Sequence, residues 1–121
     1  METHELAKFQ VPVSELRDKT AAVGIEWHHL PIRDVDVPDE KFEHLWTMSG
    51  PRLRSLLLQG EKIVIHCLGG LGRTGTIAAR LLVEFGAAPA EAIKAVRAAR
   101  SGSIETTEQE QYVKKCARSH N

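Results

Sequence analysis

The chain has 121 residues, is 42% hydrophobic, and balances its 16 basic residues against 16 acidic ones. This length predicts a single domain spanning residues 1–121, and the balanced charge argues against nucleic acid or a membrane surface as the partner. A polar N-terminus and the lack of any run of about 18 apolar residues argue against export and membrane insertion, so we expect a cytoplasmic protein.

The first half of the chain predicts alternating helices and strands. A helix is expected from Pro12 to Ala22, with Gly24 as its stop. A short strand follows over 25–30, then a loop between Pro31 and Pro38 that is rich in aspartate. The apolar residues of 39–48 recur at helical spacing. The sequence Ser-Gly-Pro at 49–51 predicts an interruption before a further helix over 52–58.

The second half begins with an apolar strand over 62–66 and a glycine-rich loop. A helix is expected to run to Phe85 and to end at Gly86, and the next begins after Pro89. Thr106 or Thr107 is expected to cap a last helix that ends near Ala117. Strands separated by helices predict an α/β domain with a central, mostly parallel sheet flanked by helices.

The most informative segment is 66–75, which reads His-Cys-Leu-Gly-Gly-Leu-Gly-Arg-Thr-Gly. Cys67 and Arg73 lie six positions apart, with three glycines between them. A strand, a glycine-rich turn and a helix N-terminus form an anion site, because the backbone N–H groups can point inward. A nucleotide-binding loop would end in Gly-Lys-Ser/Thr, whereas this loop holds a thiol. The pattern indicates attack by a thiolate on phosphorus.

The groups expected to bind the phosphate are the guanidinium of Arg73 and a run of backbone amides. The guanidinium offers a planar fork for two phosphate oxygens. The helix N-terminus and this positive charge are expected to lower the pKa of the Cys67 thiol from about 8.5 into the range of roughly 3.5–7.5. The amides belong to Leu68, Gly69, Gly70, Leu71 and Gly72.

The His-Cys-x5-Arg-Thr pattern resembles the signature loop of the cysteine-dependent protein tyrosine and dual-specificity phosphatases. Together with His-Leu-Pro-Ile-Arg-Asp at 29–34, it is most similar to the kinase-associated phosphatase branch and its bacterial-type relatives. The resemblance implies the phosphotyrosine protein phosphatase II-like fold in a minimal version that lacks N-terminal strands. An unpaired strand edge would then be covered by the N-terminal segment of a monomer or would pair in an edge-strand dimer.

The resemblance also implies a role for each motif residue. Cys67 would form a phosphocysteine intermediate, and Asp34 would act as general acid, with Asp36 and Asp39 as rivals close in sequence. His66 would orient the loop and Thr74 would donate a hydrogen bond to the thiolate. No metal or cofactor is implied.

The sequence around 104–109 departs from the better-known pattern of the family. Many tyrosine phosphatases place a glutamine here that positions the hydrolytic water, whereas this chain has Glu105, with Gln109 as a nearby alternative. A carboxylate can hold water but also repels phosphate. Neither residue is a firm catalytic assignment.

The expected substrate is a phosphotyrosine protein or a small arylphosphate, with phosphoserine or phosphothreonine left open. Leucines at 68 and 71, where relatives that act on inositol phospholipids tend to carry lysines, argue against those lipids. An alternative function is a phosphate-binding module with little or no turnover. Cys116 is expected to be a packed or half-exposed thiol, with a redox role toward Cys67 as the alternative, and Arg97 is expected on a solvated helix face.

Overall fold

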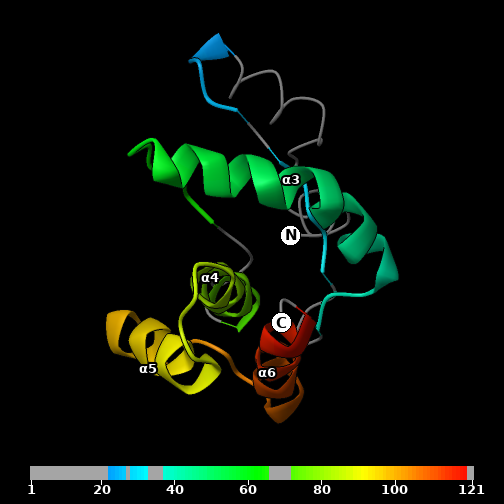
Figure 1. The fold of residues 1–121 in the computed structure, drawn as a ribbon, viewed down its shortest axis with the longest axis vertical. Coiled ribbons are helices and arrows are strands. Elements are labelled where there is room, and N and C mark those ends of the chain that lie inside the picture. The colour runs from blue at the N-terminus through cyan, green and yellow to red at the C-terminus, as the bar shows by residue number, and fades with distance from the viewer. Residues whose placement is uncertain (1–21, 27, 33–36, 66–71, 120–121) are drawn as a thin grey trace, which may run out of the picture.

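The computed structural model describes residues 22–26, 28–32, 37–65 and 72–119. The helices in this part of the chain are α3 (Glu40–Leu58), α4 (Gly72–Glu84), α5 (Pro89–Ala99) and α6 (Thr107–Ser119), shown in Figure 1. None of the helices described is long and apolar enough to cross a membrane. Most of the predicted helix from Pro12 to Ala22 lies outside the described residues, but Gly24 has the left-handed φ of 78° expected at a helix stop.

Helix α3 is continuous, so the predicted interruption at 49–51 is wrong. Asp39 caps its N-terminus by accepting a hydrogen bond from the Phe42 amide at 2.9 Å. Pro51 lies inside the helix. A proline there costs about 3 kcal/mol, which burial of an aromatic face can offset. That face consists of Phe42 and Trp46, whose rings stack at 5.6 Å. Gly50 admits the indole, since a Cβ at Gly50 would lie 2.5 Å from Trp46 Nε1.

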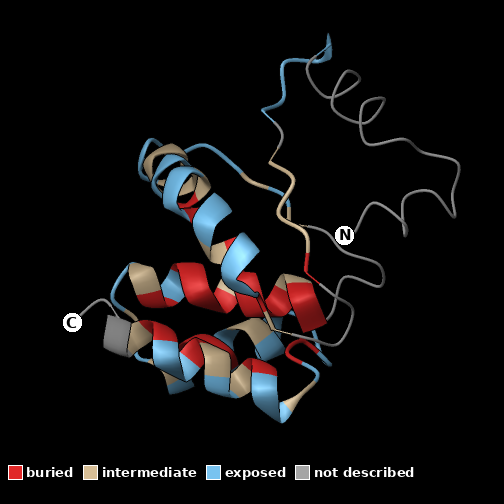
Figure 2. Ribbon diagram, turned by 90° about the vertical axis from the view of Figure 1, so that its right-hand side faces the viewer, coloured by how far each residue is buried: buried red, intermediate tan, exposed pale blue. Residues whose placement is uncertain are grey.

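Helix α4 is the centre of the fold, and both hydrophobic clusters form around it. In Figure 1 it lies between α3 on one side and α5 and α6 on the other, and Figure 2 shows that much of its surface is buried. Ala79 and Val83 belong to a cluster shared with α5 and α6. Ile77 and Leu81 belong to a second cluster that contains Ile32 and the aromatic face of α3. Helix α4 is therefore held firmly on two sides.

The predicted central parallel sheet is contradicted, because the described residues contain helices and no strand. The apolar stretch over 62–65 packs Ile63 and Ile65 against the second cluster and leaves Val64 88% exposed. Alternation of this kind fits a half-buried strand, but a strand also needs backbone hydrogen bonds to a neighbour. None of the 62–65 residues is paired in this way within the described chain.

The other predicted strand, over 25–30, binds α3 through its side chains instead. His28 Nδ1 lies 2.8 Å from Ser49 Oγ, and Arg52 Nη2 lies 3.0 Å from Glu26 Oε1. The hydrogen bond from Arg52 lowers the pKa of the Glu26 carboxyl to about 2. The prediction failed because these polar contacts dock the segment on a helix rather than beside a strand.

The ends of the last three helices agree with the sequence. Gly86 has a φ of 104° after α4, and Pro89 begins α5. Thr106 caps α6, because its Oγ1 accepts from the Gln109 amide at 3.0 Å and Gln109 Oε1 accepts from the Thr106 amide at 3.2 Å. This reciprocal pair is a capping box, which satisfies two backbone donors at once.

Candidate functional site

The first turn of α4 carries the described end of the glycine-rich motif. Gly72 and Arg73 are buried and Thr74 is half-buried. Thr76 Oγ1 donates to the Gly72 carbonyl at 2.7 Å and so closes this turn internally. The positive end of the helix dipole and the first-turn amides, which have no acceptor within the helix, make this the place on α4 where an anion is stabilised.

Arg73 joins the two motifs that the sequence singled out. Its side chain is buried, with 3% of the residue exposed, and Nη1 donates to the Ile32 carbonyl at 3.0 Å. Ile32 is the residue directly before the 33–36 loop, which carries Asp34 and lies outside the described residues. Residues 41 positions apart in sequence are thus in contact, and the start of the aspartate loop lies beside the first turn of α4.

A short segment, Ser103 to Glu105, presses against the same turn. A Cβ at Gly75 would lie 2.8 Å from Ser103 Cβ and 3.0 Å from the Ile104 amide nitrogen. A Cβ at Gly72 would lie 2.4 Å from Glu105 Oε1. Gly75 is therefore needed for close packing against the backbone of this segment, and Gly72 lies in direct contact with the Glu105 carboxylate.

Glu105 and Gln109 form a chain of contacts that reaches the motif. Glu105 Oε1 accepts a hydrogen bond from the Gly72 amide at 3.0 Å, and the backbone amide of Glu105 donates to Gln109 Oε1 at 2.8 Å. Gln109 is fully buried, whereas Glu105 is exposed. Gln109 therefore positions the backbone at Glu105 and caps α6, while the Glu105 carboxylate touches the anion-binding end of α4.

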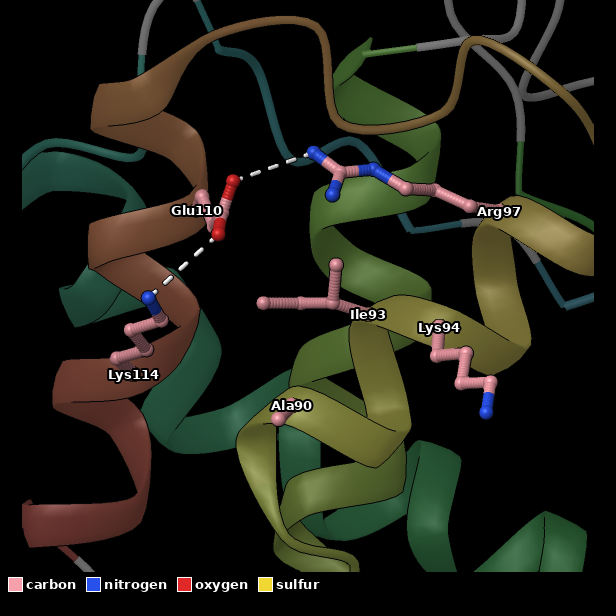
Figure 3. A pocket seen from close by; sticks show the side chains of 6 residues that line it. All are labelled: Ala90, Ile93, Lys94, Arg97, Glu110 and Lys114. Carbon is pink, nitrogen blue, oxygen red and sulfur yellow. Dashed lines mark hydrogen bonds and ion pairs between the residues drawn. The ribbon is translucent and has the colours of Figure 1, made fainter.

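Arg97 is exposed, as the sequence predicted for a solvated face, but the prediction missed its contacts with the 103–105 segment. Its guanidinium donates to the carbonyls of Ser103 at 3.2 Å and Ile104 at 3.1 Å, and it pairs with Glu110 at 3.3 Å (Figure 3). Ile104 is the one non-glycine residue of the described chain with a left-handed backbone, at a φ of 61°. A conformation of this kind costs about 1 kcal/mol or more and persists only where surrounding contacts hold it. The position of Arg97 in the last turn of α5, just before a tight turn, was the available signal.

A cavity of about 350 Å³ lies between α5 and α6 (Figure 3). Three of its four charged residues are engaged with one another, since Glu110 pairs with Arg97 and with Lys114. It contains no nucleophile, so it is not the candidate site for the chemistry that the sequence indicates. Its lining is Ala90, Ile93, Lys94, Arg97, Glu110 and Lys114.

The other end of α4 carries a buried polar cluster centred on Arg80. Its guanidinium binds Glu43 at 2.6 Å and Glu84 at 3.2 Å, contacts the hydroxyl of Tyr112, and lies 4.8 Å from the Trp46 ring centroid. Burial disfavours the charge of Arg80, but the hydrogen bond to Glu43 and the charge interactions with Tyr112, Cys116 and Glu43 together outweigh it and raise the pKa of Arg80. This cluster ties α3 and α6 to α4.

Cys116 lies beside that cluster and is buried, with 7% of the residue exposed. Burial raises the pKa of the Cys116 thiol, although Arg80 acts in the opposite direction. A neutral, buried thiol is a poor nucleophile. The structure therefore supports a packing role for this residue.

The predicted site residues divide between described and undescribed parts of the chain. Gly72, Arg73, Thr74, Glu105 and Gln109 are described, and contacts link Gly72 to Glu105 and Glu105 to Gln109. The remaining predicted residues lie outside the described ranges, so their roles stay predictions. They are Asp34, His66, Cys67, Leu68, Gly69, Gly70 and Leu71.

Several curated proteins are similar in sequence to this chain. Cyclin-dependent kinase inhibitor 3 of Rattus norvegicus is 38% identical over 112 residues, which cover 90% of this chain and 50% of the relative. The probable protein tyrosine phosphatase type IVA A of Dictyostelium discoideum is 35% identical over 94 residues, covering 77% of this chain and 55% of the relative. The chain thus spans about half the length of these curated relatives.

A solved structure is also similar in backbone. It is a crystal structure of kinase associated phosphatase (KAP) in which serine replaces the catalytic-site cysteine. It matches with a TM-score of 0.83 and 34% identity, over 98% of this chain and 66% of the other. The described helices are therefore those of a phosphatase fold.

A family-level comparison covers most of the chain. Residues 14–113 match the family described as "PTP-SAK: Swiss Army Knife protein, DSP-PTPase phosphatase domain". The matched range contains the glycine-rich motif, the aspartate loop and the 103–105 segment. The chain therefore belongs to the DSP-PTPase phosphatase domain family, within the dual-specificity phosphatase superfamily.

Proposed function

We propose that this chain is a phosphomonoester hydrolase, a protein tyrosine or dual-specificity phosphatase that works without a metal. Its substrates are phosphotyrosine proteins or small arylphosphates. The names of the relatives support this assignment, since they include a probable protein tyrosine phosphatase and a kinase associated phosphatase. The observation that carries it is the hydrogen bond from Arg73 to the Ile32 carbonyl, because it joins the Cys-x5-Arg motif to the aspartate loop.

In the first proposed step the Cys67 thiolate attacks phosphorus and the bond from phosphorus to the leaving oxygen breaks. Asp34 gives its proton to that oxygen, so the alcohol or phenol leaves neutral. The family relative with a named catalytic-site cysteine supports Cys67 in this role. His66 orients the loop, and Thr74 donates a hydrogen bond to the sulfur.

In the second proposed step a water molecule attacks the phosphocysteine. Asp34, now a carboxylate, takes a proton from the water, and the phosphorus–sulfur bond breaks to release phosphate and the thiolate. Arg73 and the loop amides stabilise the phosphoryl oxygens in both steps, and preorganised donors of this kind are commonly the largest contribution to catalysis. These donors supply the positive charge that a metal supplies in other phosphatases.

The test is hydrolysis of para-nitrophenyl phosphate by the chain without added metal. We expect Cys67→Ser to reduce turnover to background, because serine is a far weaker nucleophile at neutral pH. Cys116→Ser is the matched control, because it also replaces a thiol by a hydroxyl but at a buried position away from the motif. We expect this variant to retain turnover in the folded protein. Hydrolysis that survives in Cys67→Ser would refute the proposal.

A further inference from the structure

We propose that Glu105 competes with the substrate phosphate for the Gly72 amide and so limits the affinity of the site for phosphate. This inference rests on the proposed function, in which the Gly72 N–H is one of the donors to phosphate. Glu105 Oε1 accepts a hydrogen bond from that donor at 3.0 Å. A carboxylate and a phosphate both accept hydrogen bonds from the amides at the N-terminus of a helix, so they compete for the same group.

The contact is built into the packing of the chain. A Cβ at Gly72 would lie 2.4 Å from Glu105 Oε1, so the carboxylate packs directly against the motif glycine. The Glu105 backbone is held on one side by Gln109, whose Oε1 accepts from the Glu105 amide at 2.8 Å. On the other side Arg97 donates to the Ile104 carbonyl at 3.1 Å. The backbone of Glu105 is therefore held in place beside the first turn of α4.

The side chain itself is free to leave. Glu105 is exposed, whereas its neighbours Ser103 and Ile104 are buried with 3% of each residue exposed. Rotation about the side-chain bonds of Glu105 can release the amide without moving the buried part of the segment. An arriving phosphate can thus displace the carboxylate, but the displaced negative charge stays close to a dianion and weakens its binding.

The proposal predicts that substitution of Glu105 changes the affinity for phosphate more than it changes the turnover number. Glu105→Gln removes the like charge and leaves a weaker, neutral acceptor, and Glu105→Ala removes both the charge and the acceptor, so both should lower KM and the inhibition constant of inorganic phosphate. The expected gain is about threefold to fivefold, the size of a charge contribution at an exposed helix N-terminus. The turnover number should change less, because Glu105 is displaced before the chemical steps.

The experiment measures binding of inorganic phosphate by calorimetry in the Cys67→Ser background, so that turnover plays no part. It compares the parent protein with Glu105→Gln and Glu105→Ala. Glu108→Gln is the matched control, because Glu108 is an exposed glutamate three residues further on that loses the same charge. We expect tighter phosphate binding in both Glu105 variants and no change in the control. The NMR resonance of the Gly72 amide should shift on substitution of Glu105. At equal phosphate concentration, adding phosphate should move this resonance less in the Glu108→Gln control than in the Glu105 variants.

Unchanged or weaker phosphate binding in Glu105→Gln and Glu105→Ala would overturn the inference. Glu105 would then have a structural role in holding the loop. Equal tightening in Glu108→Gln would also overturn it, because the effect would then be one of overall charge. Failure of the proposed function is recognised separately. A protein that binds phosphate more tightly in the Glu105 variants, while hydrolysing no arylphosphate with Cys67 intact, retains this inference and loses the enzymatic one.

Discussion

Two arginines on the same face of α4 are buried to a similar degree but have different surroundings. Arg73 and Arg80 lie seven residues apart, two helical turns, with 3% and 8% of each residue exposed. Arg80 meets the carboxylates of Glu43 and Glu84 and the hydroxyl of Tyr112. Arg73 lies in the Cys-x5-Arg motif at the N-terminus of the helix and donates to the Ile32 carbonyl.

The difference predicts that one end of α4 serves function and the other end serves stability. Burying a charge is costly unless it is paired, and the Arg80 cluster meets that condition with side chains from α3, α4 and α6. Arg73 lies where the helix dipole and the motif amides favour an anion. Cys116 lies near Arg80, and the motif spacing predicts that Cys67 lies near Arg73. The comparison predicts a functional pair at one end of α4 and a structural pair at the other.

The largest effect is expected for Arg73→Lys. Lysine keeps the charge but loses the planar fork, so we expect kcat/KM for an arylphosphate to fall by about 10²- to 10³-fold, as for loss of one preorganised donor. Arg80→Lys is the matched change on the same helix and should alter kcat/KM less than about threefold in the folded protein. Equal losses in the two variants, measured with circular dichroism spectra that match the parent, would end the distinction between the two arginines.

The next effect is on stability and belongs to Arg80. Arg80→Met removes the cation between Glu43 and Glu84 and should lower the free energy of unfolding by about 2–3 kcal/mol, because the side chain of Glu84 is only 1% exposed. Arg54 still pairs with Glu84, which keeps the loss below that of a fully orphaned charge. Urea denaturation followed by fluorescence measures the change. Lys94→Met, on the exposed face of α5, is the control and should shift stability by less than about 0.5 kcal/mol.

The smallest effect concerns the two cysteines. Burial raises the pKa of Cys116, so its thiol stays neutral at pH 7, and iodoacetamide should alkylate Cys67 at least about tenfold faster. The same pKa shift makes the free energy of unfolding depend on pH. Because the pKa of Cys116 is raised in the folded state, its contribution to stability is present below the ordinary thiol pKa of about 8.5 and is lost as the pH rises through the folded-state pKa. Peptide mapping by mass spectrometry at pH 7 and pH 9 checks the order of labelling. Faster labelling of Cys116 at pH 7 would contradict it.

Local signals predicted the helices around the site well. Pro89, Gly86 and Thr106 mark ends of α5, α4 and α6 close to where the structure places them, because a cap or a fixed φ acts within a few residues. The same reasoning failed at Pro51, where packing of Trp46 against Gly50 carries the helix onward. It failed again at 25–30 and 62–65, because alternation cannot reveal whether a neighbouring strand is present.

The sequence by itself determined the family of the chain, through the match over residues 14–113, and it predicted the chemistry of the candidate site from the residue types and spacing of Cys67, Arg73 and Asp34. Only the tertiary structure decided which distant groups meet it. Ile32 reaches Arg73 and Glu105 reaches Gly72 across 41 and 33 positions. Contacts of that range depend on how α4 is packed between its neighbours, and no local pattern of residues encodes that packing.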